Sequence, residues 1–164
     1  MKAEFDTTDC FIEHGKLALP YTYFAGRVGS KFLTTIRDQK KIMGIRCNKC
    51  NKVYVPPRQT CDVCLEDIRD NWVDDVQSVG KITNYTVVRY SDKHLPKKPP
   101  YILALIKLGG ADTALAHVVE GIAIEKVKIG MKVQAVFAKE TTSTILDIDH
   151  FEPVPQLVKR QKGK

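Results

Sequence analysis

Four cysteines in two pairs of identical spacing are the feature that most constrains this chain. Cys47, Cys50, Cys61 and Cys64 follow the pattern C-x2-C-x10-C-x2-C within the stretch CNKCNKVYVPPRQTCDVC. Two intervening residues let both thiolates of a pair reach one ion from a tight turn, and the longer arm can fold back as a hairpin to bring the second pair opposite. The pattern therefore predicts a tetrahedral site with four sulfur ligands.

Such a site leaves no open position at the metal. An ion held by four protein ligands cannot activate water or polarise a substrate, so the sequence predicts a structural centre. Four-cysteine sites hold zinc or a single iron; we expect one zinc per chain, and a rubredoxin-like electron carrier would require iron instead. The residue after each pair benefits from left-handed backbone geometry, which Asn51 tolerates and Leu65 tolerates poorly. An irregular second turn is therefore expected.

Cysteine usage and the N-terminus also bear on the compartment. The chain has five cysteines, with Cys10 standing alone, and an odd number of this kind fits a reducing compartment better than a disulfide framework. The N-terminus has acidic residues where a secretory signal would need a basic start, and no run is apolar for long enough to span a membrane. We expect a soluble, cytoplasmic protein with no membrane partner.

The formal charge of +7 is gathered in two segments rather than spread over the chain. The C-terminal tail contributes Lys159, Arg160, Lys162 and Lys164. A proline-rich loop contributes Lys93, Lys97 and Lys98. The remaining body is close to neutral. This distribution argues against a broad nucleic-acid-binding face.

The chain is long enough for one ordinary domain and a small added module. We expect an N-terminal arm with an amphipathic helix, a four-cysteine ribbon, a barrel domain, and a basic disordered tail, at residues 1–44, 45–70, 71–153 and 154–164. In the first zone, Ser30 is the expected helix N-cap and Gly44 the expected stop. One face of that helix should carry Phe32, Leu33, Ile36 and Met43.

After the cysteines the pattern changes to short runs rich in β-branched and aromatic residues. The five candidate strands are residues 80–90, 101–108, 113–121, 131–139 and 143–153. They are separated by turn-forming segments and contain no long helix between them. The expected fold is therefore mainly β, with a five-stranded, partly open Greek-key barrel of the OB type following the ribbon.

Other candidate chemistry is weaker. Cys10 and His14 would share a helical face as a thiol and base, but they lie in an unpatterned arm with no third group to orient the base. His117 lies in an apolar strand, where a core histidine is the simpler interpretation. The aromatic residues Tyr85, Tyr90 and Tyr101 could stack on bases, so a single-stranded nucleic-acid-binding module remains the alternative function.

The order of these parts resembles a known family. The segments that carry the resemblance are GIRCNKC, VPPR, CDVC, WVDDVQSVGKITNYTVVRY, PPYILALIKLGGADT and IGMKVQAVF. From about Lys31 to Pro153 the chain is similar to small acyl-CoA-associated proteins that join a rubredoxin-like zinc ribbon to a C-terminal OB-fold. It departs from them at Asn51 and Leu65, where glycine is common, and in its long N-terminal arm.

The resemblance implies a role beside a larger enzyme. Family members accompany thiolases or related condensing enzymes in hetero-oligomers, as non-catalytic subunits that support a coenzyme A site bound mainly by the partner. In that role, charge would bring the phosphates of coenzyme A (CoA) to Arg58, Lys93, Lys97 and Lys98. Within the family, the resemblance points to the small subunit of a benzoylsuccinyl-CoA-type thiolase of anaerobic toluene degradation.

Overall fold

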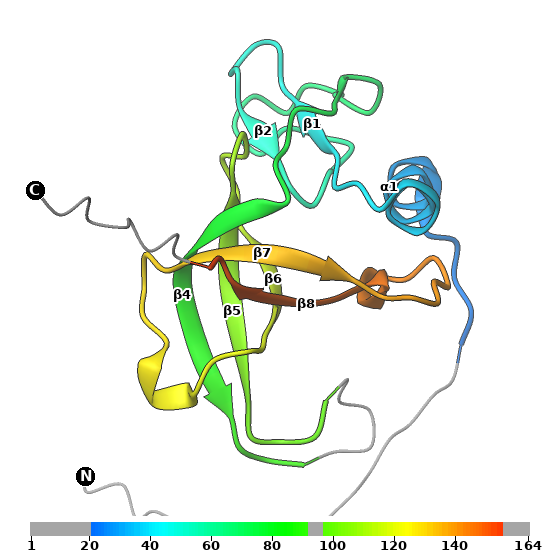
Figure 1. Ribbon diagram of the computed structural model, residues 1–164. Coiled ribbons are helices and arrows are strands. Elements are labelled where there is room, and N and C mark those ends of the chain that lie inside the picture. The colour runs from blue at the N-terminus through cyan, green and yellow to red at the C-terminus, as the bar shows by residue number, and fades with distance from the viewer. Residues whose placement is uncertain (1–20, 92–96, 156–164) are drawn as a thin grey trace, which may run out of the picture.

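Three parts follow one another in the structure: a helix, a small sheet beside the cysteines, and a barrel (Figure 1). The structure is a computed structural model that describes residues 21–91 and 97–155. The predictions made for Cys10, for Lys93, for the first part of the N-terminal arm and for the basic tail lie outside the described residues. None of the helices in the described ranges is long and apolar enough to cross a membrane.

Helix α1 spans Gly26–Gln39 and so begins four residues before the predicted cap at Ser30. Its apolar stripe is as expected, with Phe32 and Ile36 one turn apart and buried. The predicted stop at Gly44 is wrong, because Lys40 takes the left-handed position at φ 51° and its N–H bonds to the carbonyl of Ile36 at 3.0 Å. Met43 is consequently not part of the helix.

The cysteine region forms a three-stranded antiparallel sheet with the order β2-β1-β3. Its strands are β1 (Gly44–Arg46), β2 (Val53–Tyr54) and β3 (Trp72–Val73). Gly44 is closely packed here, because a Cβ atom on it would lie 3.0 Å from a methyl group of Val53. The buried cluster of this sheet contains Ile45, Cys47, Tyr54, Cys61 and Ile68.

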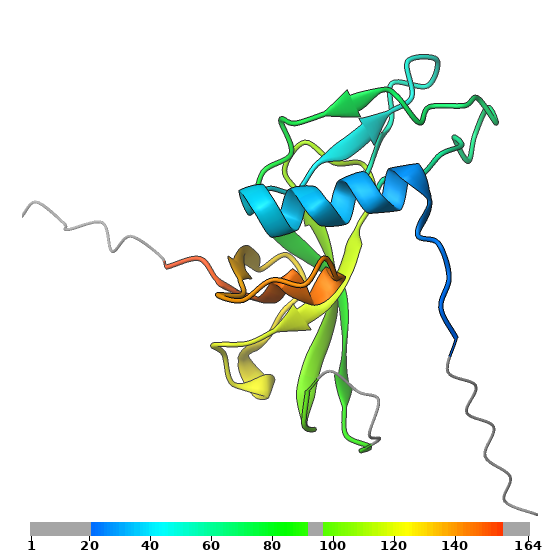
Figure 2. The ribbon, with the colours of Figure 1, turned by 90° about the vertical axis from the view of Figure 1, so that its right-hand side faces the viewer.

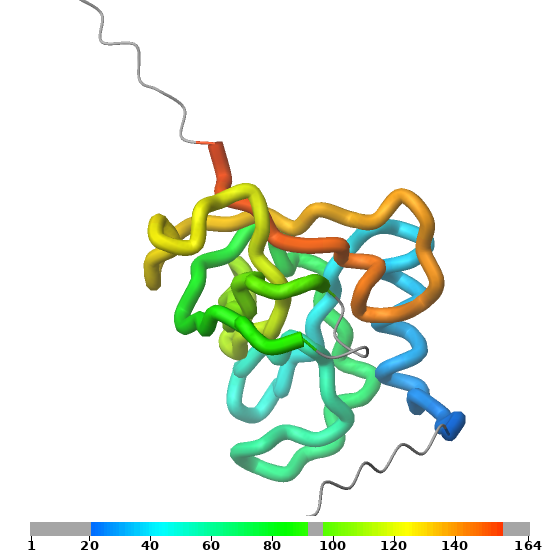
Figure 3. Tube along the Cα trace, turned by 90° about the horizontal axis from the view of Figure 1, so that it is seen from below, coloured from blue at the N-terminus to red at the C-terminus, as the bar shows by residue number. Residues whose placement is uncertain are grey.

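The five predicted strands are present and form a closed barrel in the order β4-β5-β6-β8-β7. They are β4 (Val79–Val88), β5 (Tyr101–Leu108), β6 (Leu115–Val119), β7 (Lys132–Phe137) and β8 (Ile148–Pro153), with short 3₁₀ helices η1 (Ile124–Lys126) and η2 (Ile145–Asp147) between them. The expectation of a partly open barrel is wrong. Pairing of β4 with β7 and of β6 with β8 joins the edges, and Figure 3 shows the paired strands β7 and β8, in orange and red, running side by side.

Alternation along β5 shows how the sequence fills the barrel. In YILALIKL, Ile102, Ala104 and Ile106 point inward and are buried, whereas Leu103 and Leu105 face outward. Side chains of successive strand residues point to opposite faces, so this period of two places the apolar set inside. The alternation thus places the apolar side chains of this strand in the core of the barrel.

The ribbon is fixed to the barrel by hydrogen bonds and by Val53 and Val55, which belong to the core of the barrel, while the other buried residues of the ribbon form a separate cluster. The N–H of Val53 donates to the Asp112 carboxylate at 2.8 Å, and the N–H of Asp112 donates to the Val53 carbonyl at 2.9 Å. The N–H of Val55 donates to the Thr113 hydroxyl, which in turn donates to the Val55 carbonyl. Figure 2 shows α1 lying between the ribbon and the barrel. On its barrel side, Arg37 donates to the Ser143 hydroxyl at 2.9 Å.

Candidate metal centre and its surroundings

The four cysteine sulfur atoms converge on one point, all within 4.8 Å of one another. The Sγ atoms of Cys47 and Cys64 are 3.5 Å apart, and those of Cys50 and Cys61 are 3.9 Å apart. A tetrahedral zinc with Zn–S bonds of about 2.3 Å requires sulfur–sulfur edges of about 3.8 Å. The cysteines are therefore positioned to bind a metal, and their spacing fits zinc.

The two cysteine turns have the same backbone geometry. Asn51 and Leu65 both adopt the left-handed conformation, at φ 54° and 59°. In each turn the N–H of the first cysteine bonds to the carbonyl five residues later, at 2.9 Å for Cys47 and 3.0 Å for Cys61. The predicted irregularity of the second turn is wrong. Leu65 accepts the strained conformation because these bonds hold it, while its side chain remains 77% exposed.

A buried tyrosine lies behind one of the ligands. The Tyr54 hydroxyl is 3.2 Å from the Cys61 sulfur and also lies beside the Asp62 carboxylate, so its single proton faces both acceptors. Its hydrogen bond lowers the pKa of Cys61 to about 6, whereas the neighbouring Cys64 sulfur raises the pKa of Cys50 to about 12. Tyr54 is thus placed to support a thiolate at Cys61, which is the form that binds metal.

Arg58, one of the predicted contacts for CoA phosphates, lies in this ribbon. Its guanidinium is 4.7 Å from the centre of the Tyr54 ring and 3.7 Å from the Asp62 carboxylate. Lys52 reaches the same carboxylate at 3.2 Å. The charge of Arg58 is therefore shared with Asp62 and with the ring rather than directed at open solvent alone.

Lys97, a second predicted phosphate contact, is held by carboxylates. Its ammonium is 3.0 Å from Glu120 and 3.2 Å from Asp149, and Asp149 also pairs with His150 at 2.7 Å. Glu120, Asp149 and His150 are the other group of potential metal ligands in the described ranges. The lysine fills this group, which makes it an ion-pair cluster; Lys98 is exposed.

The structure does not bring Arg58 together with Lys97 and Lys98. Strands β4 and β5 start their pairing at Gly80 and Leu108, beside the ribbon, and end it at Val88 and Tyr101. The two lysines precede Tyr101 and so lie at the end of the barrel away from the ribbon (Figure 1). Arg58, Lys97 and Lys98 therefore do not form one phosphate site, and Lys93 lies outside the described residues.

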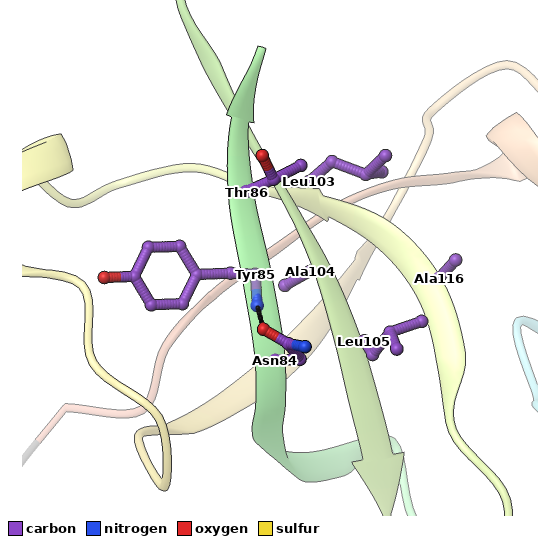
Figure 4. A pocket seen from close by; sticks show the side chains of 7 residues that line it. All are labelled: Asn84, Tyr85, Thr86, Leu103, Ala104, Leu105 and Ala116. Carbon is purple, nitrogen blue, oxygen red and sulfur yellow. Dashed lines mark hydrogen bonds between the residues drawn. The ribbon is translucent and has the colours of Figure 1, made fainter.

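The tyrosines considered for base stacking do not share an open face. Figure 4 shows a shallow hollow of about 220 Å³ on the outer surface of β4, β5 and β6, with Leu103 and Leu105 on one side and Tyr85 turned the other way. The Tyr85 hydroxyl donates to the carbonyl of Val127 at 3.3 Å, and Tyr101 is buried. Only Tyr90, of these three, has a largely exposed ring.

The comparisons with known proteins follow this division of the chain. Residues 35–68 match the family described as ChsH2, rubredoxin-like zinc ribbon domain, and residues 73–138 match ChsH2, C-terminal OB-fold domain. A DUF35 domain-containing scaffold protein of Methanocaldococcus jannaschii is 32% identical over 109 residues, which are 63% of this chain and 72% of that protein. The chain belongs to the ChsH2/DUF35 family.

Other members of the ChsH2/DUF35 family agree with this assignment. A DUF35 domain-containing scaffold protein of Pyrococcus furiosus is 26% identical over 67% of this chain and 78% of its own length. A solved structure of a DUF35 protein of unknown function from Sulfolobus solfataricus has a TM-score of 0.54 at 28% identity, over 68% of this chain and 78% of that one. A chain of an Ltp2-ChsH2(DUF35) aldolase has a TM-score of 0.59 at 24% identity, over 78% and 95%, and shares the fold.

Proposed function

We propose that this ChsH2/DUF35 protein is the non-catalytic, zinc-binding subunit of a thiolase complex and supports the partner enzyme and its CoA site. The observation that carries the proposal is the four-cysteine centre, which offers a metal no open position, in a ribbon that is fixed to the barrel through Val53 and Val55. A centre of this kind stabilises a shape rather than performing chemistry. The description of two relatives as scaffold proteins supports the same role.

Exposed apolar side chains support a protein partner. Tyr21, Tyr23 and Phe24, which precede α1, have at least three quarters of their surface open to solvent. On the barrel, Leu103 and Leu105 are also exposed, beside the hollow of Figure 4. Clustered exposed aromatic and aliphatic residues are typical of protein interfaces.

The choice of a thiolase comes from the resemblance of the sequence, and it makes an aromatic acyl-CoA of the benzoylsuccinyl type the first substrate to test. The structural relative described as an Ltp2-ChsH2(DUF35) aldolase favours a second candidate, an aldolase partner. Thiolases and aldolases both form or break a carbon–carbon bond next to a carbonyl group. The two candidates therefore differ in the partner's reaction and not in the role of this chain.

The deciding experiment is affinity purification of the tagged protein from its native cells, with mass spectrometry of the co-purifying chains and metal analysis of the same sample. Recovery of a thiolase with about one zinc per copy of this chain supports the proposal. Recovery of an aldolase replaces the thiolase by the second candidate. Recovery of nucleic acid, with binding to single strands that weakens steeply with salt, would instead support the nucleic-acid alternative.

A further inference from the structure

Three lysines form a row across the outer surface of the barrel. Lys81 on β4 is directly opposite Lys107 on β5 and directly opposite Lys132 on β7. Adjacent strands are about 4.8 Å apart, so the row extends over about 10 Å. We call Lys81, Lys107 and Lys132 the lysine row. The three residues are far apart in the sequence, and strand register brings them together.

The positive charge of the lysine row is not neutralised within the described residues. None of its three ammonium groups has an ion pair there, whereas Arg46, Lys52 and Arg58 in the ribbon all do. Two carboxylates of the barrel are engaged elsewhere: Glu152 accepts from Gln134 at 2.8 Å, and Asp112 accepts from the N–H of Val53. Like charges placed directly opposite on neighbouring strands disfavour folding, so the row requires another explanation.

Protection of a sheet edge does not explain the lysine row. Proteins often place lysine on edge strands to prevent pairing with other chains. In this closed barrel each of β4, β5 and β7 is paired on both sides. The lysines therefore lie on interior strands, where there is no edge to protect.

The lysine row lines a hollow of the size that small ligands occupy. Its volume is about 570 Å³, and its remaining lining includes the backbone of Gly80, Gly109 and Gly110. Ligand pockets have volumes of about 300 to 1,000 Å³. Lys132 also lines a second hollow of about 750 Å³ that contains Ile129 and Met131. One ligand with a charged end and a less polar arm could therefore contact both hollows.

We propose that the lysine row binds the phosphate groups of a nucleotide-type ligand. Lysine ammonium groups bind phosphate as point charges, and three of them match the charge of a ligand that carries two or three phosphate groups. The concave, small-molecule scale of the hollow favours such a ligand over a long polynucleotide or a flat protein surface. Given the proposed function, on which this last step rests, the source is the 3′-phospho-ADP end of CoA.

The test uses calorimetric titration of the full-length, zinc-loaded protein at low salt. The probes are CoA, dephospho-CoA and ADP, and the row variant is Lys81→Gln/Lys107→Gln/Lys132→Gln. The matched control is Lys49→Gln/Lys126→Gln/Lys139→Gln, which removes the same charge from exposed positions outside the row. We expect the dissociation constant for CoA to rise at least tenfold in the row variant and less than twofold in the control. Metal content and circular dichroism check that both variants fold.

The relative affinities for CoA, dephospho-CoA and ADP show which ligand supplies the phosphate groups. Tighter binding of CoA than of dephospho-CoA and ADP assigns the row to CoA, whereas equal binding of all three assigns it to free nucleotides and contradicts CoA as the source. Absence of binding by the wild-type protein, or equal loss in both variants, overturns the inference. If the row variant loses a co-purifying enzyme instead, the row is a protein-docking surface, and the proposed function stands without it. Tighter binding of single-stranded DNA than of CoA overturns both this inference and the proposed function.

Discussion

The ribbon and the barrel reach a folded structure by different means. The buried cluster of the ribbon is small, and two of its members, Cys47 and Cys61, belong to the metal site. The barrel encloses a larger set that includes Ile82, Ile106 and Phe151. A small module with few apolar contacts needs a cross-link such as a metal, whereas a closed barrel is held by its core. The difference predicts that loss of the metal unfolds the ribbon without unfolding the barrel, and that a cavity in the barrel leaves the zinc affinity unchanged.

Removal of one metal ligand should have the largest effect and should be confined to the ribbon. Structural zinc sites in small modules contribute about 10 to 16 kcal/mol of binding free energy. We expect Cys61→Ser to lose stoichiometric zinc and to change the fluorescence of Trp72, the single tryptophan, which lies in β3. Amide hydrogen exchange in β5 should remain slow. Cys10→Ser is the control and should retain the metal; unfolding of the barrel along with the ribbon would contradict the separation.

A cavity in the barrel should produce the converse result. Ile106 is fully buried, so Ile106→Ala should lower the free energy of unfolding by about 2 to 5 kcal/mol. Leu105, its neighbour on the opposite face of β5, is 43% exposed, and Leu105→Ala should change it by less than about 0.5 kcal/mol. Denaturant titration followed by circular dichroism measures both. Zinc affinity should be equal in the two variants, and a lower affinity in Ile106→Ala alone would argue against independence.

The hydrogen bond behind Cys61 gives a smaller effect within the ribbon. Tyr54→Phe removes the hydroxyl 3.2 Å from the Cys61 sulfur while keeping the ring on which Arg58 packs. Removal of a partner of a metal ligand typically costs 10-fold to 100-fold in metal affinity, so we expect a loss in that range. Competition with a chromophoric chelator measures it. Tyr90→Phe, on an exposed ring, is the control, and equal affinities for the two variants would exclude this role for Tyr54.

The smallest expected effect compares two residues of one turn. Leu65 is left-handed and exposed, so Leu65→Gly should stabilise the zinc-bound ribbon by about 1 kcal/mol, equivalent to roughly fivefold tighter zinc binding. Val63 is also exposed but is not among the residues with positive φ, so Val63→Gly should weaken binding instead. Changes of the same sign in both variants would show that backbone strain at Leu65 is not the cause.

Short-range patterns predicted much of this molecule. The spacing of the cysteines identified the residues whose sulfur atoms converge, and short runs rich in β-branched and aromatic residues between turns identified the strands of the barrel. Both patterns express geometry within a few residues of the chain. The helix limits were less well predicted, because Lys40 takes the left-handed position that glycine usually occupies. Likewise, hydrogen bonds made by other residues of the turn hold Leu65 in the left-handed conformation that leucine normally avoids.

Features that depend on long-range register were not predicted. The lysine row requires β4 to pair with β5 and β7 in one particular register, and nothing local in the sequence marks Lys81, Lys107 or Lys132. Closure of the barrel depends on contacts of the same kind. Conversely, the lysines that did stand out in the proline-rich segment include Lys97, whose charge is taken up by carboxylates from β8 and the end of β6. The number of charged residues in a stretch of sequence is therefore a poor guide to which charges remain unpaired on the folded surface.

The hydrogen bonds between β2 and the turn after β5 have a consequence for regulation. They tie the ribbon to Asp112, and the same turn supplies Gly109 and Gly110 to the hollow beside the lysine row. If the lysine row binds an anion as proposed, any coupling between metal occupancy and anion binding would pass through this short segment. By thermodynamic reciprocity, whatever factor zinc contributes to the affinity for the anion, the anion contributes to the affinity for zinc.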